Sequence, residues 1–290
     1  MTIDILSDLH LDFYFRGEKN HADAVQKLYT PIFIQQEQRS VGNVLIVAGD
    51  LGHDNLQNID ILKHIKDIFA YKHIICLLGN HDYYLIDSRQ RAKYDSNSFL
   101  RTAEMRELIN NQKDMYCLDG NVIELEGVRF GGCDSWYDGT YTLTHFSHTE
   151  DSQKQYHKTI DDNYIHRLWN QTMNDAHYIY GMDWKAFSAS ENEKIETIYK
   201  NVDVMITHIN PSIRKEHTDT LYQEEPSTGF FTFDGLNYLK NGSMKYWIFG
   251  HTHTPIEFNL EGVHCICNPM GYPGESDRGR LTKVKSIEIG

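Results

Sequence analysis

The 290-residue chain has few cysteines, and they follow no regular spacing. There are five, an odd number, whereas a disulfide framework needs an even set at regular intervals. Cys76, Cys133 and Cys265 lie in apolar, strand-like runs, so we expect the cysteines to be reduced thiols in the core. Cys265 and Cys267 alternate along one apparent strand, which leaves a metal-ligand role as the less favoured alternative.

The chain also lacks long apolar runs. None approaches the ~20 residues that a membrane-spanning helix requires. Residues 2–6 already have the character of a strand, so we expect no room for the basic region and apolar core of a signal peptide. Repeats, low-complexity tracts and flexible linkers are absent as well. We therefore expect a cytoplasmic protein with no membrane partner.

The chain has fewer basic residues than acidic residues. Lys and Arg total 28 against 41 Asp and Glu, which gives a formal net charge of −13. A negative field of this kind repels nucleic-acid backbones unless a basic groove or a bound metal reverses it locally. Nucleic acid is therefore disfavoured as a partner, although it is not excluded.

The patterning that is present favours an α/β protein. Apolar β-branched runs at 2–6, 43–48 and 73–78 predict strands, and amphipathic stretches at 21–39, 54–71 and 88–112 predict helices. Further strands are expected at 115–118, 121–125, 127–133, 203–207, 245–249, 256–260, 262–267 and 282–289. Several of these are joined by short turns typical of hairpins. We expect two mixed sheets packed together, with helices outside.

Residues 134–200 differ from the rest because they are rich in aromatic residues and have a helical period. We interpret them as a helical insertion within a single domain of residues 1–290, covering one side of the functional cleft. Trp136 is the residue expected nearest the cleft, and a role as a core anchor of the insertion is equally favoured. The histidines of this stretch share no spacing and are interpreted as solvated residues.

Residue types that bind metals recur directly after the predicted strands. In open α/β sheets, ligands bind beyond the carboxyl ends of the strands, where these segments can converge. They are Asp8 and His10 after 2–6; Asp50 after 43–48; Asn80, His81 and Asp82 after 73–78; His208 after 203–207; and His251 and His253 after 245–249.

The spacing within these segments has a physical reason. Asp8 and His10 are two residues apart, so in extended backbone both side chains project to the same side and can share one cation. His251 and His253 repeat this spacing, or are sent to different metals by a bend at Gly250. A carboxylate can bridge two cations, and Asp50 is centrally placed to do so. The pattern therefore predicts a metal site that contains more than one cation.

The ordered motifs SDLH, GD, GNHD, TH and GHTH resemble those of the calcineurin-like metallophosphoesterase superfamily. The stretches 207–212 and 267–275 further resemble a bacterial and phage branch of it. The resemblance implies a four-layer α-β-β-α sandwich that holds two divalent metal ions. Manganese or iron is favoured, and zinc, cobalt or nickel stays open. One ion would be held by Asp8, His10, Asp50 and His253, and the other by Asp50, Asn80, His208 and His251.

The expected activity is hydrolysis of a small phosphoester by a hydroxide that the two metals activate. By resemblance, His81 is the catalytic residue that protonates or stabilises the departing oxygen. Some branches place an Asp three residues after the bridging Asp to orient this histidine, but that position is His53 here. We expect Asp82 or Asp54 to serve instead, or else no residue does.

The same region bears on the substrate. Serine/threonine phosphatases of this superfamily carry Asp-Arg-Gly where this chain has His53-Asp54-Asn55, which argues against a protein phosphatase. We expect a phosphodiester or a small nucleotide to be preferred. The alternatives are a nuclease for single-stranded nucleic acid that stacks bases on Trp136, Tyr137 and Tyr141, a phosphomonoesterase, and a non-catalytic scaffold.

One phosphate contact of related proteins is missing. Relatives often carry Arg after Asn-Pro, whereas this chain has Met270. The candidate replacements, each more simply interpreted as a solvated charge, are Arg16, Arg214, Lys215, Arg278 and Arg280.

Overall fold

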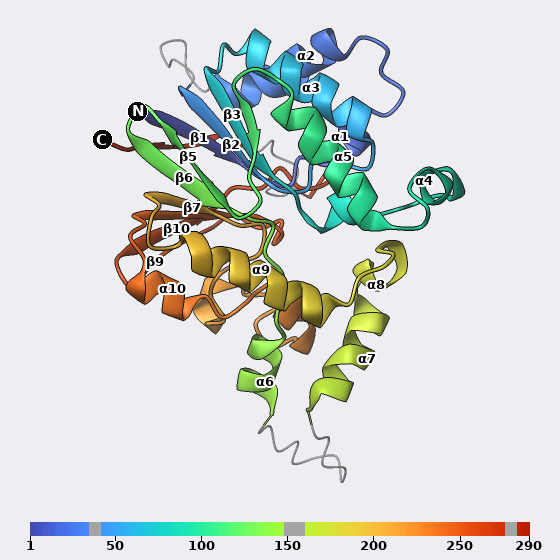
Figure 1. Ribbon diagram of the computed structural model, residues 1–290, viewed down its shortest axis with the longest axis vertical. Helices are drawn as coiled ribbons and strands as arrows, with labels where there is room; N and C mark the ends of the chain where they lie inside the picture. Colours follow the sequence, from blue (N-terminus) through green and yellow to red (C-terminus); the bar gives the residue numbers. More distant parts are fainter. Residues whose placement is uncertain (35–41, 148–159, 276–282) are drawn as a thin grey trace.

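Two β-sheets face each other at the centre of the structure, and helices cover their outer faces (Figure 1). The computed structural model describes residues 1–34, 42–147, 160–275 and 283–290. This arrangement is the predicted four-layer α/β sandwich of two mixed sheets.

The first sheet has the strand order β11-β1-β2-β3-β4. Four strands, β1 (Thr2–Leu6), β2 (Val44–Ala48), β3 (His73–Leu77) and β4 (Met115–Cys117), are parallel, and β11 (Lys285–Glu288) pairs antiparallel with β1. Helices α2 (His21–Phe33), α3 (Asn55–Ile68) and α5 (Ser98–Asn110) lie over its outer face (Figure 1). The carboxyl ends of β1, β2 and β3 therefore meet at one edge.

The second sheet has the order β5-β6-β7-β8-β10-β9. Its central strands, β6 (Val128–Gly132), β7 (Val204–Ile206), β8 (Tyr246–Phe249) and β10 (Val263–Cys267), are parallel. The outer strands, β5 (Asn121–Leu125) and β9 (Ile256–Leu260), pair antiparallel with β6 and β10. Helices α9 (Trp184–Ile198) and α10 (Leu236–Asn241) lie on its outer side (Figure 1).

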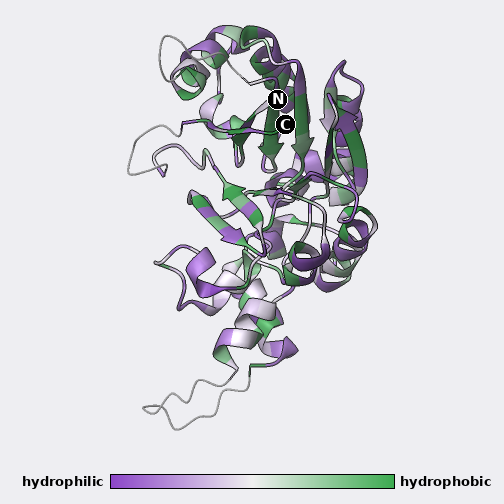
Figure 2. Cartoon of the chain, turned by 90° about the vertical axis from the view of Figure 1, so that its left-hand side faces the viewer, coloured by the Kyte–Doolittle hydropathy of each residue, from purple (hydrophilic) through white to green (hydrophobic). Residues whose placement is uncertain are grey.

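Alternating strand residues fill two separate layers of core. From β2, Val44 and Ile46 belong to the cluster between the sheets, whereas Leu45 and Val47 belong to the cluster under the helices. All five residues of β2 are buried. Such a strand has no polar face, which is why it reads as a continuous apolar run, and the strands are largely green in Figure 2.

The predicted strands correspond to strands of the structure, with differences of one to three residues at several ends. The predicted helix 88–112 is instead two helices, α4 (Ser88–Lys93) and α5. Asp95 and Ser96 adopt left-handed backbone conformations, with φ of 50° and 51°, and Asn97 caps α5 by accepting the N–H of Phe99. Helix α4 has no buried residue, whereas α5 buries Met105 and Ile109, so the two helices differ in their packing as well.

The stretch 134–200 contains α6 (Thr140–Phe146), α7 (Asp162–Thr172), α8 (Asp175–Tyr178) and α9. Helices α6 and α7 project from the body of the protein (Figure 1), while α9 packs against β5 and β6. The last part of the stretch therefore belongs to the outer helical layer of the sandwich. Part of it, 148–159, lies outside the described residues and includes His148 and His157.

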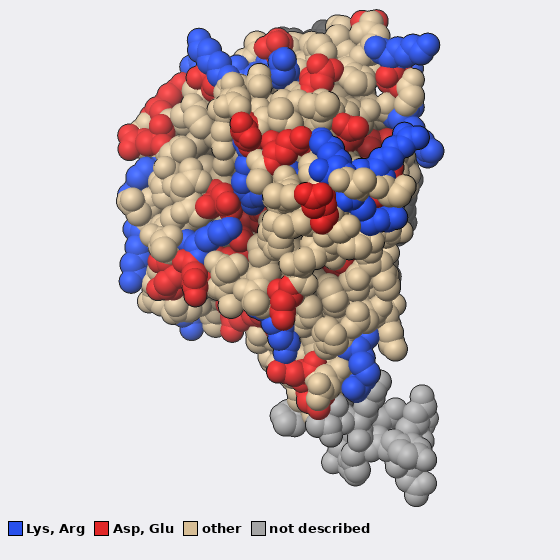
Figure 3. All heavy atoms as spheres, turned by 45° about the vertical axis from the view of Figure 1, so that its right-hand side comes forward, with Lys and Arg blue, Asp and Glu red and all other residues tan. Residues whose placement is uncertain are grey.

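The surface drawn in Figure 3 carries acidic and basic side chains interspersed. None of the described helices is long and apolar enough to cross a membrane. All five cysteines are buried and unbridged. The remaining short elements are α1 (Leu11–Tyr14) and three 3-10 helices, η1 (Asn80–Tyr83), η2 (Lys215–His217) and η3 (Pro226–Phe230).

Candidate metal centre

The segments that follow β1, β2, β3, β7 and β8 converge at the carboxyl edge shared by the two sheets. Of the side chains that the sequence assigns to metals, all are buried except His253, whose side chain is 21% exposed. The structure brings together all of these residues: Asp8, His10, Asp50, Asn80, His208, His251 and His253.

Most of these residues have an unusual backbone. Left-handed conformations are uncommon for residues other than glycine and cluster at functional sites. Five of the candidate ligands adopt one: Asp8 (φ 53°), His10 (42°), Asp50 (55°), His251 (69°) and His253 (51°). The turns they form direct side chains from separate strands toward one point. The surrounding sheets hold these conformations in place.

Two glycines make room for this convergence. A Cβ atom at Gly49 would lie 2.3 Å from Nδ1 of His208, and one at Gly79 would lie 2.2 Å from Oδ1 of Asp50. Either contact would push a candidate ligand out of place. Glycine is required at both positions because the backbone itself is packed against these side chains.

The candidate ligand atoms fall into two groups that share Asp50. Asp8, His10, Asp50 and His253 offer ligand atoms that all lie within 4.8 Å of one another, and so do Asp50, His208 and His251. Oδ1 of Asn80 lies 3.2 Å from Nε2 of His208 and so adjoins the second group. No cysteine of the described residues belongs to either group.

In three of the candidate ligand histidines, one ring nitrogen already contacts an oxygen atom of the protein. Nδ1 of His208 lies 2.9 Å from the carbonyl oxygen of Ala48, and Nε2 of His251 lies 3.0 Å from that of Phe230. Since a carbonyl only accepts, these nitrogens carry the protons, and the opposite nitrogens are left with free lone pairs. His253 is held in the same way by Glu275, 2.8 Å from its Nδ1. This is how metal-binding histidines are usually oriented.

The buried carboxylates and neutral imidazoles of the cluster favour binding of a cation. Burial raises the pKa of Asp50 well above its usual value, and the neighbouring Asp8 raises it further. Burial lowers the pKa of His10 and His251, which keeps their rings neutral and able to bind a metal. Oδ2 of Asp50 is buried and has no hydrogen-bond partner among the residues that the structure describes. The residues present therefore fit a divalent metal site.

His81 lies beside the candidate ligands and is the first residue in a chain of hydrogen bonds that runs through His53 to Asp12. Its Nδ1 is 3.0 Å from Nε2 of His53, and Nδ1 of His53 is 2.8 Å from Oδ2 of Asp12. Its Nε2 is 3.0 Å from the hydroxyl of Tyr272. Burial lowers the pKa of His81 and raises that of Tyr272. Asp12 and His53 thus orient the ring of His81.

The two carboxylates expected to orient His81 have other partners. Asp82 accepts backbone N–H groups from Gly79 at 2.8 Å and from Leu51 at 3.2 Å, so it joins two loops. Asp54 caps α3 by accepting the N–H of Gln57 at 3.0 Å. Within the described residues, the ring of His81 has a hydrogen-bond contact with His53 and none with either of these carboxylates. Asp12, at the end of the Asp-x-His-x-Asp run that starts at Asp8, was missed in the sequence.

A cavity of about 400 Å³ opens next to the candidate ligands. The wall opposite them comes from the insertion, with Thr172, Met173 and Asn174, and from residues 218–232. Its described lining contains neither Lys nor Arg, and Asp219 is the charged residue opposite the candidate ligands. Uncharged hydroxyl, amide and aromatic groups make up most of the remainder.

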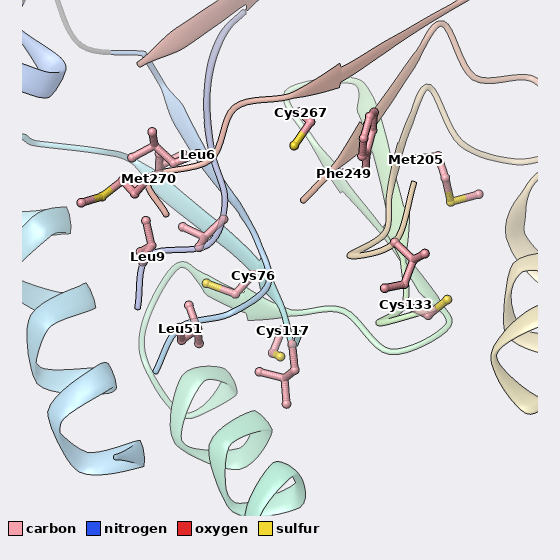
Figure 4. Packing of buried hydrophobic residues seen from close by; sticks show 14 of the residues in the cluster. Leu6, Leu9, Leu51, Cys76, Cys117, Cys133, Met205, Phe249, Cys267 and Met270 are labelled. Carbon is pink, nitrogen blue, oxygen red and sulfur yellow. The ribbon is translucent and has the colours of Figure 1, made fainter. Parts of the chain in front are cut away.

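Other candidates lie elsewhere. Trp136 does not line the cavity; it is 1% exposed and packs against Tyr83 and Phe187, which is the core-anchor alternative. Met270 is buried in the core with Leu6 and Leu9 (Figure 4). Among the candidate cations, Arg16, Arg214 and Lys215 do not line the cavity. Arg278 and Arg280 lie outside the described residues.

Comparisons with known proteins agree with this geometry. The family profile described as calcineurin-like phosphoesterase matches residues 1–255. An uncharacterised protein of Acanthamoeba polyphaga mimivirus is 24% identical over an alignment of 259 residues that covers 84% of this chain and 83% of that protein. The crystal structure of a phosphopantetheinyl hydrolase from Mycobacterium tuberculosis aligns with a TM-score of 0.63 at 16% identity. That alignment covers 99% of this chain and 95% of the other, and it shows a shared fold.

Proposed function

Since this chain belongs to the calcineurin-like phosphoesterase family, we propose that it is a binuclear metal-dependent phosphoesterase that prefers small phosphodiesters. The observation that carries the proposal is the pair of ligand groups that share Asp50, at the wall of a cavity of about 400 Å³. When bound, two divalent cations would neutralise phosphoryl charge and lower the pKa of the attacking water.

The proposed ligands of the two cations correspond to the two groups of residues described above. Asp8, His10 and His253 hold one cation, His208, His251 and Asn80 hold the other, and Asp50 contributes to both. These donors are nitrogen and oxygen atoms without thiolate, which suits manganese or iron and leaves zinc, cobalt and nickel as alternatives. The buried thiols support a reducing compartment, and we propose the cytoplasm.

His81 is proposed to act on the leaving group. It lines the cavity next to Asn80, and its Nδ1 is fixed by His53, so Nε2 is the nitrogen available to the substrate. Asp12 accepts from His53 and thereby stabilises positive charge along the pair of rings when His81 holds a proton. A proton held at Nε2 can then pass to the departing oxygen. Tyr272 contacts the same nitrogen and is displaced or shares the proton when a substrate is bound.

The cavity supports a small, weakly charged substrate. A phosphomonoester carries two negative charges, which proteins usually grip with arginine, whereas a diester carries one. The described cavity lining offers no arginine or lysine, so a diester fits it better. The interspersed charges of the face in Figure 3 give no continuous basic path for a nucleic-acid strand. The segment 172–174 lines the cavity, and we propose that the insertion restricts substrate size there.

The test is a set of assays on metal-free protein that has been reconstituted with Mn²⁺. We expect hydrolysis of bis-p-nitrophenyl phosphate, cyclic nucleotides or dinucleotides to exceed that of p-nitrophenyl phosphate, a phosphopeptide and single-stranded DNA. Preference for the monoester would reject the diester assignment, and preference for the DNA would favour a nuclease. Absence of hydrolysis for every substrate, with metal bound, would favour a scaffold.

A further inference from the structure

Asn80 differs from the other proposed ligands, because its residue type alone does not determine which side-chain atom faces the metal. Its side-chain amide has an oxygen that can bind a cation and an NH2 group that cannot. A half-turn about the last bond exchanges the two, and the change in shape is small. Something outside the metal centre must therefore determine which end faces the metal.

Asp175 supplies that determinant. Nδ2 of Asn80 lies 2.8 Å from Oδ1 of Asp175, and the hydroxyl of Tyr84 donates to the same oxygen at 2.6 Å. An oxygen that receives two donors acts as an acceptor, so the NH2 end of Asn80 must face it. The amide oxygen is then turned to the other side, where it lies 3.2 Å from Nε2 of His208.

The carboxyl group of Asp175 is itself held rigidly. It is fully buried, and its second oxygen, Oδ2, accepts from the hydroxyl of Tyr137 at 2.8 Å. That hydroxyl in turn accepts from Nε1 of Trp169. Burial raises the pKa of Asp175, and the hydrogen bonds from Tyr84, Asn80 and Tyr137 oppose this effect. Both oxygens are thus occupied by donors that fix the plane of the group.

The residues that hold this carboxyl group belong mainly to one part of the chain. Tyr137, Trp169 and Asp175 all lie in the insertion 134–200, and Asp175 is the first residue of α8. The segment 172–174, immediately before it, lines the cavity. The insertion therefore contacts the substrate space and a proposed metal ligand through adjacent residues. Neither contact depends on a residue outside the described ranges.

We propose that Asp175 is a positioning residue that fixes the amide of Asn80 with its oxygen toward the second cation, so that the insertion completes the metal centre. The proposal rests on the proposed function, since it assigns Asn80 to a metal. In this proposal the insertion positions a metal ligand, which a lid over the cavity would not do. Partners of this kind change metal affinity by about 10–100-fold when they are removed.

The experiment compares Asp175→Leu with Tyr137→Phe. The first variant keeps the approximate shape but removes both acceptor oxygens, so the NH2 group of Asn80 loses this partner. The second removes a donor from the far oxygen, Oδ2, and leaves the contact with Asn80 intact. Metal-free forms of both variants and of the wild type are titrated with Mn²⁺ by calorimetry, and thermal unfolding of each metal-free form is recorded.

We expect two Mn²⁺ sites in the wild type and in Tyr137→Phe. Asp175→Leu should weaken one of the two by about 10–100-fold and leave the other unchanged. Wild-type affinity at both sites of Asp175→Leu would overturn the inference, and so would equal losses in the two variants, which would indicate a purely structural role. A wild-type protein that binds no Mn²⁺ would overturn the proposed function as well.

An exchange of charge between positions 80 and 175 tests the same inference if Asp175→Leu fails to fold. Asn80→Asp places a second carboxylate against Asp175, whereas Asn80→Asp combined with Asp175→Asn again pairs one carboxylate with one amide. We expect the double variant to bind Mn²⁺ at the affected site at least about tenfold more tightly than Asn80→Asp alone. No recovery in the double variant would overturn the inference.

Discussion

The buried charges around Asp134 and those around Asp50 are satisfied in different ways. Asp134 pairs with Arg106, which also contacts Asp119 at 3.3 Å, and nearby Glu191 pairs with Lys194 at 2.6 Å. Tyr83 donates a further hydrogen bond to Asp134 at 2.6 Å. In this cluster the chain itself provides the cations that its buried acids need.

The cluster around Asp50 consists of acids and imidazoles, and neither Lys nor Arg is among the described residues that line the adjoining cavity. Oδ2 of its central carboxylate has no hydrogen-bond partner in the described part of the chain and lies 3.7 Å from Nε2 of His10. Both clusters have the burial and the charge that could mark a functional site. Burial alone therefore does not separate the candidate metal centre from this ion-pair network; the two clusters differ in whether Lys and Arg side chains pair with the buried acids.

The largest effect should follow from Asp50→Asn. Loss of the shared carboxylate should lower turnover by more than about a thousandfold, because charge stabilisation by metal ions is worth several kcal/mol. Metal content should fall below that of the wild type, and the metal-free variant should unfold at a higher temperature because a crowded negative charge is gone. Activity, bound metal and thermal unfolding measure these effects. Two full equivalents of metal in this variant would contradict a shared ligand.

His81→Ala should be the next most damaging change. Loss of a positioned acid should lower turnover by ~10²–10⁴ on a diester with a poor leaving group, with metal content and folding retained. The defect should shrink for bis-p-nitrophenyl phosphate, because p-nitrophenolate needs little protonation. Steady-state rates on both substrates test this. Equal losses would indicate that His81 stabilises phosphoryl oxygens, and loss of metal would place it among the ligands.

Asp12→Asn should have a smaller effect of the same kind. It removes the charge behind His53 and should lower turnover by about 10–100-fold without releasing metal. Asp54→Asn is the matched control, since Asp54 caps α3 and an asparagine caps as well as an aspartate. Kinetics and metal analysis of the two variants separate orientation of His81 from general loop damage. An Asp54→Asn protein as impaired as Asp12→Asn would count against the chain through His53.

The smallest effect on function should come from Arg106→Met, in the other cluster. Leaving Asp134 buried without its cation should reduce the free energy of unfolding by about 3–5 kcal/mol. Bound metal and turnover, measured below the unfolding temperature, should stay within about twofold of wild type, since Arg106 contacts neither the ligands nor the cavity. Chemical denaturation supplies the stability. Loss of metal in Arg106→Met would contradict the distinction between the Asp134 cluster and the Asp50 cluster.

The sequence predicted the strands and the convergence of residues at their ends because both depend on local patterns. An apolar run of about five residues predicts a buried strand, and polar residues after several such runs meet once the strands are parallel. The roles of these residues as ligands stay predictions. The break between α4 and α5 was missed, although Asp95, Ser96 and Asn97 are residue types that favour turns and helix caps.

Partners that meet only in the folded protein could not be predicted in this way. Asp12 and His53 are 41 residues apart, and Asn80 and Asp175 are 95 apart, with no shared motif. Asp82 was favoured for its place next to His81, but adjacent residues on a 3-10 turn point in different directions. The position of Trp136 in the core depends on the packing of α9, which the local sequence does not specify.

The site takes its residues from nearly the whole chain, and this constrains when it can form. During synthesis, Asp8, Asp50 and Asn80 emerge long before His251 and His253, and Glu275, which holds His253, emerges later still. The early half offers two carboxylates, an amide and the imidazole of His10, without the three later imidazoles that complete the centre. A cation captured at that stage lacks these three ligands and exchanges more readily. Secure metal loading therefore belongs to the end of folding, after β8 has taken its place beside β7.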